Sequence, residues 1–226
     1  LTNAPYAGYL KIDDFELLSC SPELFIDFQA QQQIVTRPIK GTMPRYADPE
    51  QDQQSKQRLI QSEKDQAENL MIVDLLRNDL SVYAEIGSVK TNKLFEIESF
   101  AQVHHLVSDI EAVRRADVSS LEVLLHALPG GSITGAPKIR AMEIIDQVEP
   151  VKRGVFGGAV GYLGWHGEMD MSIAIRTCVI RENKVYVQAG AGLVVDSNPE
   201  SEWNETQIKA RAVIKAVELS SNGLIL

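Results

Sequence analysis

Strand-like segments of this chain follow one another directly instead of alternating regularly with helices. Short apolar runs at 6–12 and 15–21 flank two aspartates at 13–14, a pattern typical of a β-hairpin. Further strand-like sequence covers 23–28 and 33–39. A doubly wound parallel sheet needs a repeated strand–helix–strand order, which this chain lacks. The sequence therefore predicts an α+β fold.

Helix signals interrupt the strand runs at a few places. Asp48 followed by Pro49 is a typical helix start, and the apolar periodicity across 50–79 predicts the longest helix, or two helices separated by one break. A capping pattern of serines and a glutamate predicts a further helix over 119–129. The other expected elements are strands at 86–90, 93–99, 102–111, 155–165, 169–180 and 184–191, and a final helix at 196–218.

Composition and charge exclude several classes of partner. The 226 residues are 44% hydrophobic, which is enough for a sizeable core, and carry a formal net charge of −9. Because clustered Lys and Arg bind phosphate backbones and anionic lipids, this acidic chain is expected to bind neither nucleic acid nor a membrane. Cys20 and Cys178 lack disulfide-framework and metal-ligand spacing, which favours a reducing, cytoplasmic location.

A glycine-rich loop, PGGSITGAPKIRAM at 129–142, leads into an amphipathic segment. Pro137 is expected at the first helical position, where the free N–H groups of the helix end face the loop. Such a helix start suits a carboxylate or a phosphate. The loop has the glycines of a nucleotide P-loop, but Ala136 and Pro137 stand where that motif needs Lys and Ser or Thr. A small-anion site or a simple helix entry is therefore favoured over nucleotide binding.

Three glutamates form a candidate site for a divalent cation. Glu202, Glu205 and Lys209 fall at i, i+3 and i+7 of the final helix, so they share one face. A solvated polar face explains this pattern equally well. Glu68 lies at the edge of an increasingly apolar helix, where exposure to solvent is not assured. Carboxylates from two helices are ligands that suit Mg²⁺.

Lys40 is a candidate nucleophile or base. It lies in RPIKGT between an apolar strand end and Gly41, from where its amine can point into the interior. Desolvation favours the free amine of a buried lysine. An exposed, solvated lysine is the alternative interpretation. Glu23 in SPELF and His105 in VHHLVS are further acid or base candidates.

Motifs along nearly the whole chain resemble those of the chorismate-binding enzymes. They occur in this order: SPELF, RPIKGTMPR, KDQAENLMIVDLLRND, VHHLVS, PGGSITGAPKIRAMEIID, GGAVGYLG, MDMSIAIRT and AGAGLVVDSNPESEWNET. Within this family the chain is most similar to component I of the aminodeoxychorismate synthases, also called para-aminobenzoate synthases. Anthranilate synthase component I is the close relative, but it usually carries alanine in place of the PIKGT lysine and AGTLSG in place of GGSITG.

The resemblance implies a layered α+β fold in which two antiparallel sheets stack face to face with helices outside. It also implies that residues 1–226 are the C-terminal portion of a single chorismate-binding domain. The family's sequences extend further toward the N-terminus, whereas this chain opens on Leu1-Thr2-Asn3 without a methionine. An incomplete N-terminal part of the domain is therefore expected.

The same resemblance implies a Mg²⁺-dependent amination of chorismate at C4, which feeds para-aminobenzoate and folate synthesis. Ammonia would come from a separate glutamine amidotransferase subunit. Lys40 matches the nucleophile, Glu23 the general acid and His105 a residue beside the ring. The metal ligands are matched by Glu68, Glu202 and Glu205, and the substrate-binding positions by Ser132, Arg176, Gly190, Gly192 and Lys209.

Two alternative functions remain. An anthranilate synthase would release pyruvate and a fluorescent aromatic product from the same substrate. A chain that is only a portion of a domain could instead bind Mg²⁺ and carboxylates without catalysis. The products distinguish the first alternative, and turnover of chorismate distinguishes the second.

Overall fold

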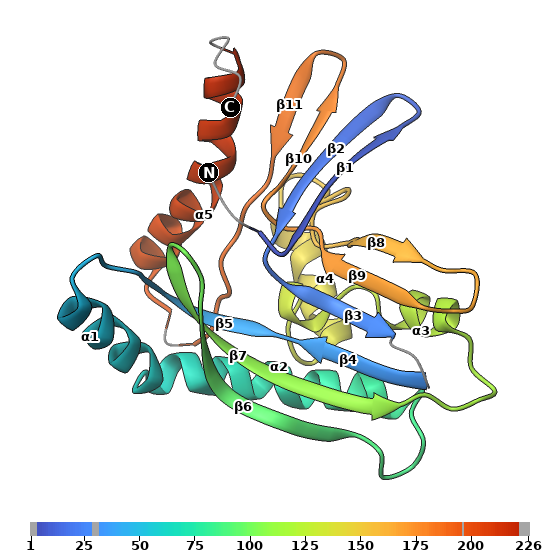
Figure 1. The fold of residues 1–226 in the computed structure, drawn as a ribbon. Coiled ribbons are helices and arrows are strands. Elements are labelled where there is room, and N and C mark those ends of the chain that lie inside the picture. The colour runs from blue at the N-terminus through green and yellow to red at the C-terminus, as the bar shows by residue number, and fades with distance from the viewer. Residues whose placement is uncertain (1–3, 29–31, 196, 222–226) are drawn as a thin grey trace. The chain divides into compact units, whose positions relative to one another are not determined.

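The computed structural model describes residues 4–28, 32–195 and 197–221 (Figure 1). The expectations that concern Leu1 to Asn3 and Asp196 lie outside these residues. The contacts divide the chain into two compact units, and each has its own antiparallel sheet. The smaller unit comprises Leu1–Pro22, Arg153–Gly157 and Ala174–Leu226, and the larger unit comprises Glu23–Lys152 and Gly158–Ile173.

Four described strands form the sheet of the smaller unit, in the order β1-β2-β10-β11. β1 (Tyr6–Ile12) and β2 (Phe15–Ser21) form the hairpin that the sequence predicts, and Asp13 closes its turn with a φ of 45°. β10 (Thr177–Arg181) and β11 (Lys184–Val187) form a second hairpin. Since β10 pairs antiparallel with β2, the two hairpins make one sheet.

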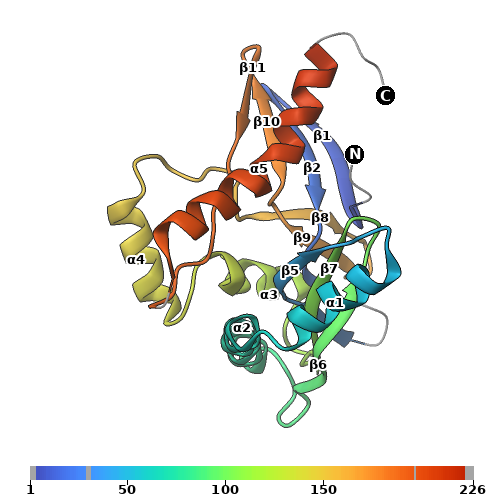
Figure 2. The ribbon, with the colours of Figure 1, turned by 90° about the vertical axis from the view of Figure 1, so that its left-hand side faces the viewer.

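The final helix, α5 (Pro199–Ser221), contacts β11 and completes the smaller unit (Figure 2). The side chain of Asn198 accepts the backbone N–H groups of Glu200 and Ser201, both at 3.1 Å. This cap explains why the helix begins at Pro199, within the segment 196–218 that the sequence predicts to be helical.

Among the described residues, seven strands form the sheet of the larger unit, and every pairing is antiparallel. The order is β5-β7-β4-β3-β9-β8, and β6 also pairs with β7. β7 thus pairs with three other strands, more than any other strand of this sheet. The strands are β3 (Leu24–Phe28), β4 (Gln33–Arg37), β5 (Ile39–Pro44), β6 (Lys90–Ser99), β7 (Val103–Val113), β8 (Ala159–Leu163) and β9 (Met169–Ile173).

Two helices, α1 (Pro49–Ile60) and α2 (Glu63–Ser81), pack on β5 and β7. They confirm the single break expected in the long helical segment. The break follows from a new cap, because the Ser62 hydroxyl accepts the backbone N–H of Asp65 at 3.3 Å. The core between these helices and the sheet contains Leu59, Ile72, Val73, Leu106 and Ile110, each at most 2% exposed.

Three shorter elements follow β7 in the larger unit. α3 (Ser120–Ala127) begins with the predicted capping box between Ser119 and Glu122. The glycine-rich loop then forms a short 3₁₀ helix, η2 (Gly131–Ile133), ahead of α4 (Lys138–Val148). Pro137 is the residue before the first turn of α4 and not its first helical residue, because its backbone is extended with ψ of 135°.

Several predicted strands were wrong in extent, among them 155–165, which shortens to β8, and 184–191, which shortens to β11. The segment 86–89 is not a strand, because Gly87 turns the chain with a φ of +79° and Ile86 is fully exposed. The segment 169–180 divides into β9 and β10, which belong to different sheets. Arg176, with a φ of 50°, lies in the short connection between them.

The structure confirms the α+β class with antiparallel sheets. The face-to-face stacking of the sheets and their membership of one domain stay predictions. No helix in the described residues is long and apolar enough to cross a membrane.

Gly161 in β8 marks a close approach of two backbones. A Cβ built there would lie 1.8 Å from the carbonyl oxygen of Asp170 in β9. We expect Gly161→Ala to separate the two strands and to lower the free energy of unfolding by about 1–3 kcal/mol. Gly8→Ala in β1, where a Cβ meets nothing within 4 Å, is expected to change it by less than about 0.5 kcal/mol. Urea unfolding measures both, and equal costs would contradict the close-approach explanation.

Candidate active site

Lys40 lies at an irregularity in the pairing of β5 with β7. Ile39 pairs with Val107 and Thr42 pairs with His105, so three steps along β5 match two steps along β7. This count defines a β-bulge at Lys40 and Gly41, and bulges redirect the side chains that they carry. The strand predicted at 33–39 ends at Arg37 in β4, and Lys40 lies instead at a bulge near the start of a separate strand, β5.

The amine of Lys40 reaches the glycine-rich loop. Its Nζ donates a hydrogen bond to the carbonyl oxygen of Ser132 at 3.3 Å, and the lysine is half-buried. The loop lies tightly against α2, since a Cβ on Gly131 would come within 2.5 Å of the Leu75 side chain. The structure thus brings Lys40 and Ser132 together, as a shared site requires.

His105 lies on β7 opposite Thr42, the first paired residue of β5 beyond the bulge. It is 3% exposed, and its Nδ1 lies 2.9 Å from the hydroxyl oxygen of Thr42. The ring of Phe100 meets the imidazole edge-on, with 5.5 Å between the ring centroids. The imidazole is therefore held in one orientation, and Thr42 and Lys40 come from the same strand.

Two acidic candidates also belong to the larger unit. Glu23 directly precedes β3 and is 6% exposed, and its carbonyl oxygen accepts the N–H of Ile173 at 3.1 Å. Glu68 on α2 is partly buried and pairs with Lys64 one turn earlier, at 3.7 Å between Oε1 and Nζ. Asn69 beside it is fully buried and accepts a hydrogen bond from Ser108 of β7. The acid at 68 therefore lies at the boundary between solvent and the core, as its sequence position predicts.

The smaller unit holds the remaining candidates, of which Arg176 is the most buried cation. Burial lowers the pKa of its guanidinium. The carbonyl oxygen of Arg176 accepts the N–H of Cys20 on β2 at 3.1 Å, which fixes its backbone beside the sheet. A desolvated guanidinium binds carboxylates strongly, so this residue suits an anionic substrate group.

The polar face of α5 is partly paired. Glu205 and Lys209 form an ion pair with 2.5 Å between Oε1 and Nζ, and Nζ also donates to the carbonyl oxygen of Gly190 at 3.4 Å. Glu202 is only 5% exposed, so a fully solvated face is the wrong interpretation for this residue. Gly190 and Gly192 follow β11 outside any strand, although the strand predicted at 184–191 includes Gly190. A Cβ on either glycine would meet nothing within 4 Å.

The carboxylate oxygens of Glu68, Glu202 and Glu205 are of the ligand type that Mg²⁺ takes. Glu68 belongs to the larger unit, whereas Glu202 and Glu205 belong to the smaller unit. Within the part of the chain that the structure describes, no group of three or more His, Cys, Asp or Glu residues is arranged to hold a metal ion. The magnesium site therefore stays a prediction.

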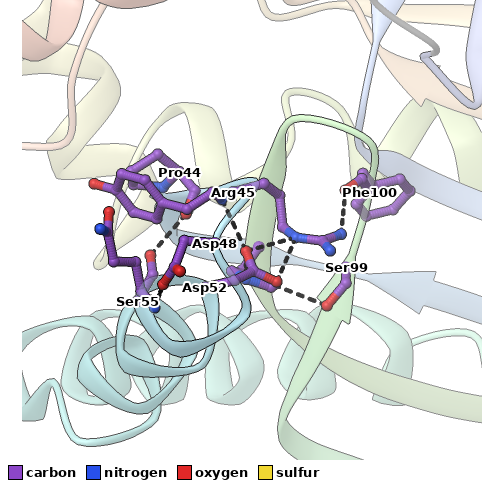
Figure 3. Close-up of polar contacts among 10 residues, drawn as sticks. Pro44, Arg45, Asp48, Asp52, Ser55, Ser99 and Phe100 are labelled. Atoms are coloured by element: carbon purple, nitrogen blue, oxygen red, sulfur yellow. Dashed lines mark hydrogen bonds and ion pairs between the residues drawn. The ribbon is translucent and has the colours of Figure 1, made fainter.

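The sequence analysis missed a polar cluster beside the Lys40 strand (Figure 3). Its centre is Asp52 of α1, whose carboxylate accepts the Nε–H of Arg45 at 2.8 and 3.0 Å and the backbone N–H of Tyr46 at 3.0 Å. The Nε2 of His104 donates to the same carboxylate at 3.1 Å. We call Arg45, Asp52 and His104 the Asp52 clamp. No spacing rule could have found it, because its members are brought together by the fold.

The clamp carboxylate is strongly stabilised in its charged form. The hydrogen bond from Arg45 is the largest cause, and with the bonds from Tyr46 and His104 it lowers the pKa of Asp52 from 3.8 to about 2. A carboxyl group with a lowered folded-state pKa contributes stability above its unfolded-state pKa, and this contribution is lost as the pH falls toward the folded-state value.

Asp52→Asn is therefore expected to remove a pH-dependent part of the stability. The difference in free energy of unfolding between the parent and the variant should have its largest value above about pH 5 and should shrink steadily toward about pH 2. Urea unfolding at a series of pH values measures this difference. A difference that stays constant across that range would contradict the ionised clamp.

Comparisons with known proteins agree with the family resemblance of the sequence motifs. Over 213 residues, the chain is 62% identical to anthranilate synthase component 1 of Acinetobacter calcoaceticus, covering 94% of this chain and 42% of that protein. It is 50% identical over 215 residues to aminodeoxychorismate synthase component 1 of Klebsiella aerogenes, covering 95% and 48%. The crystal structure of anthranilate synthase component I from Streptococcus pneumoniae TIGR4 superposes with a TM-score of 0.84 at 38% identity, over 93% of this chain and 46% of that one.

The chain thus spans less than half the length of these relatives. The family model described as chorismate binding enzyme matches residues 1–215. On this match and these identities, the chain belongs to the family of chorismate-binding enzymes.

Proposed function

We propose that the protein carrying this chain aminates chorismate at C4 to give 4-amino-4-deoxychorismate. The observation that carries the proposal is the lysine at the β5 bulge, with its amine 3.3 Å from the Ser132 carbonyl oxygen and one strand away from the buried His105. The PIKGT lysine is also the feature by which the sequence resembles aminodeoxychorismate synthases and differs from anthranilate synthases. A relative of that name is 50% identical to this chain.

In the proposed reaction, the free amine of Lys40 attacks C2 of chorismate. The ring double bonds shift and the hydroxyl leaves C4 as water, with Glu23 supplying the proton. Ammonia then adds at C4, the double bonds shift back, and the lysine leaves C2 as the free amine. The covalent intermediate divides one difficult displacement into two easier steps.

The cations of the chain would hold the substrate carboxylates. Arg176 offers a desolvated guanidinium, and Lys209 an ammonium beside the Gly190 carbonyl oxygen. Glu68, Glu202 and Glu205 would hold Mg²⁺, which when bound supplies positive charge against a substrate carboxylate. Ammonia would come from a separate glutamine amidotransferase subunit, and we expect the enzyme to be cytoplasmic.

Anthranilate synthase is the second candidate function. It is favoured by the 62% identity to the Acinetobacter calcoaceticus protein of that name. The same substrate and ammonia would then give anthranilate and pyruvate, and Lys40 would not need to be a nucleophile. A chain that binds Mg²⁺ and carboxylates without turnover is the remaining alternative.

Lys40→Ala is expected to abolish formation of 4-amino-4-deoxychorismate, because the nucleophile is lost. The full-length protein that carries these residues is incubated with chorismate, Mg²⁺ and ammonium, and the products are identified by mass spectrometry. Lys152→Ala, which removes a lysine that is 84% exposed, is the matched control and should keep the parent rate.

The parent protein decides between the candidates in the same assay. Anthranilate with pyruvate would identify the second candidate function. An unchanged rate of C4 amination in Lys40→Ala would remove the lysine from the mechanism, and no turnover of chorismate by a folded parent would leave only the binding alternative.

Chelation of Mg²⁺ is expected to stop turnover, and added Mg²⁺ to restore it. Glu205→Gln should raise the Mg²⁺ concentration needed for half-maximal rate, because one anionic ligand is lost. Glu200→Gln, in the first turn of the same helix, serves as the control. An equal Mg²⁺ requirement in both variants would exclude Glu205 from the metal site.

A further inference from the structure

The backbone of the β5 bulge is tightly packed at Gly41, the residue that follows Lys40. Gly41 has a φ of +80°, and a Cβ there would lie 2.8 Å from Leu59 Cδ1 and 2.9 Å from Asp65 Cγ. Only glycine fits such a position without strain. The bulge therefore packs against both α1 and α2. The direction in which the Lys40 side chain points then depends on the pairing of β5 with β7 beyond the bulge.

The pairing beyond the bulge is short. Only Thr42, Met43 and Pro44 continue β5, opposite His105, His104 and Val103. Pro44 has no N–H to donate, so this end has fewer backbone hydrogen bonds than an ordinary strand of the same length. A slip by one residue here would turn Thr42 away from His105, because neighbouring side chains of a strand point to opposite faces.

On the side of α1, hydrogen bonds of the Asp52 clamp hold the C-terminal end of β5 in place. The residue that follows β5, Arg45, donates its backbone N–H to the Gln102 carbonyl oxygen at 3.0 Å and an N–H of its guanidinium to the Phe100 carbonyl oxygen at 2.9 Å. Its Nε–H donates to Asp52 of α1 (Figure 3). The hydroxyl of Ser55, one turn along α1, donates to the Pro44 carbonyl oxygen at 2.7 Å.

On the side of β7, His104 of the clamp holds the same end of β5. His104 is 2% exposed, with Nε2 on Asp52 and Nδ1 2.8 Å from the hydroxyl oxygen of Ser99 on β6. Because His104 and His105 are consecutive on β7, they point to opposite faces of the sheet. Fixing the His104 ring on the face toward α1 therefore also fixes the backbone that presents His105 on the other face.

We propose that Arg45, Asp52 and His104 are positioning residues, which hold β5 in register with β7 beyond the bulge and so aim Lys40 and orient His105. The proposal rests on the proposed function in one respect, since it takes Lys40 as the reacting group. It assigns a role in the reaction to residues that touch neither the substrate nor the reacting amine.

The alternative is that Asp52 only stabilises the start of α1. The structure separates the two roles, because another residue already caps this helix. Asp48 is the N-cap residue, and its carboxylate accepts the Gln51 N–H at 2.9 Å. Loss of such a cap costs about 1 kcal/mol of stability. Asp48→Ala is therefore a matched control that weakens the same helix and leaves the clamp intact.

The experiment compares Asp52→Asn with Asp48→Ala in the full-length protein. The first readout is kcat and KM for chorismate with ammonium. The second is the rate at which N-hydroxysuccinimide acetate labels Lys40, measured by peptide mass spectrometry relative to Lys152. This second readout needs no turnover, so it decides the positioning role even if the parent makes no aminated product and the proposed function fails.

Asp52→Asn is expected to lower kcat about tenfold or more while KM changes less than about threefold, because the reacting group is misplaced and substrate binding is kept. Lys40 should be labelled several-fold faster, since the half-buried strand end loosens. Asp48→Ala should leave kcat, KM and the rate of Lys40 labelling unchanged. Equal effects in the two variants, or unchanged labelling of Lys40 in Asp52→Asn, would overturn the proposal.

A second pair of variants keeps the test decisive if Asp52→Asn does not fold. His104→Gln retains an N–H that can donate to Asp52, whereas His104→Ala does not. The glutamine variant should keep Lys40 labelling and kcat closer to the parent than the alanine variant does. Equal behaviour of the two variants would show that His104 contributes packing alone.

Discussion

The pairing of β5 with β7 is the constraint on which the candidate active site of the larger unit depends. One extra residue on β5 turns Lys40 toward the Ser132 carbonyl oxygen, while Thr42 and His105 stay in register. A side chain at position 41 would collide with both α1 and α2, so the bulge cannot move freely along the strand. The chemistry proposed for Lys40 is thus tied to packing between a sheet and two helices.

The dianionic substrate proposed for this protein places a requirement on the local charges of the chain. The chain has a net charge of −9, so its overall field would repel a dianion, and local cations must supply the attraction. Burial of the Arg176 guanidinium strengthens its interaction with a carboxylate. In contrast, the Arg45 guanidinium is used internally, where it holds Asp52 ionised within the clamp.

Local signals made much of the fold predictable. The hairpin turn at Asp13, the cap at Asp48 and the capping box at Ser119 each act through neighbouring residues, and the structure confirms all three. The bulge and the Asp52 clamp were not predictable, because they depend on a strand register and on contacts between residues as far apart as 52 and 104. The motifs likewise identified the family and candidate residues, but not the hydrogen bonds that orient them.

The most direct test of the central claim is peptide mass spectrometry of the full-length protein after incubation with chorismate and Mg²⁺ in the absence of ammonia and glutamine. The account predicts that the intermediate accumulates, with Lys40 carrying the mass of chorismate less one water. The account would be contradicted if the protein turned over chorismate when ammonia was supplied but its Lys40 peptide never carried this mass, even after rapid quenching.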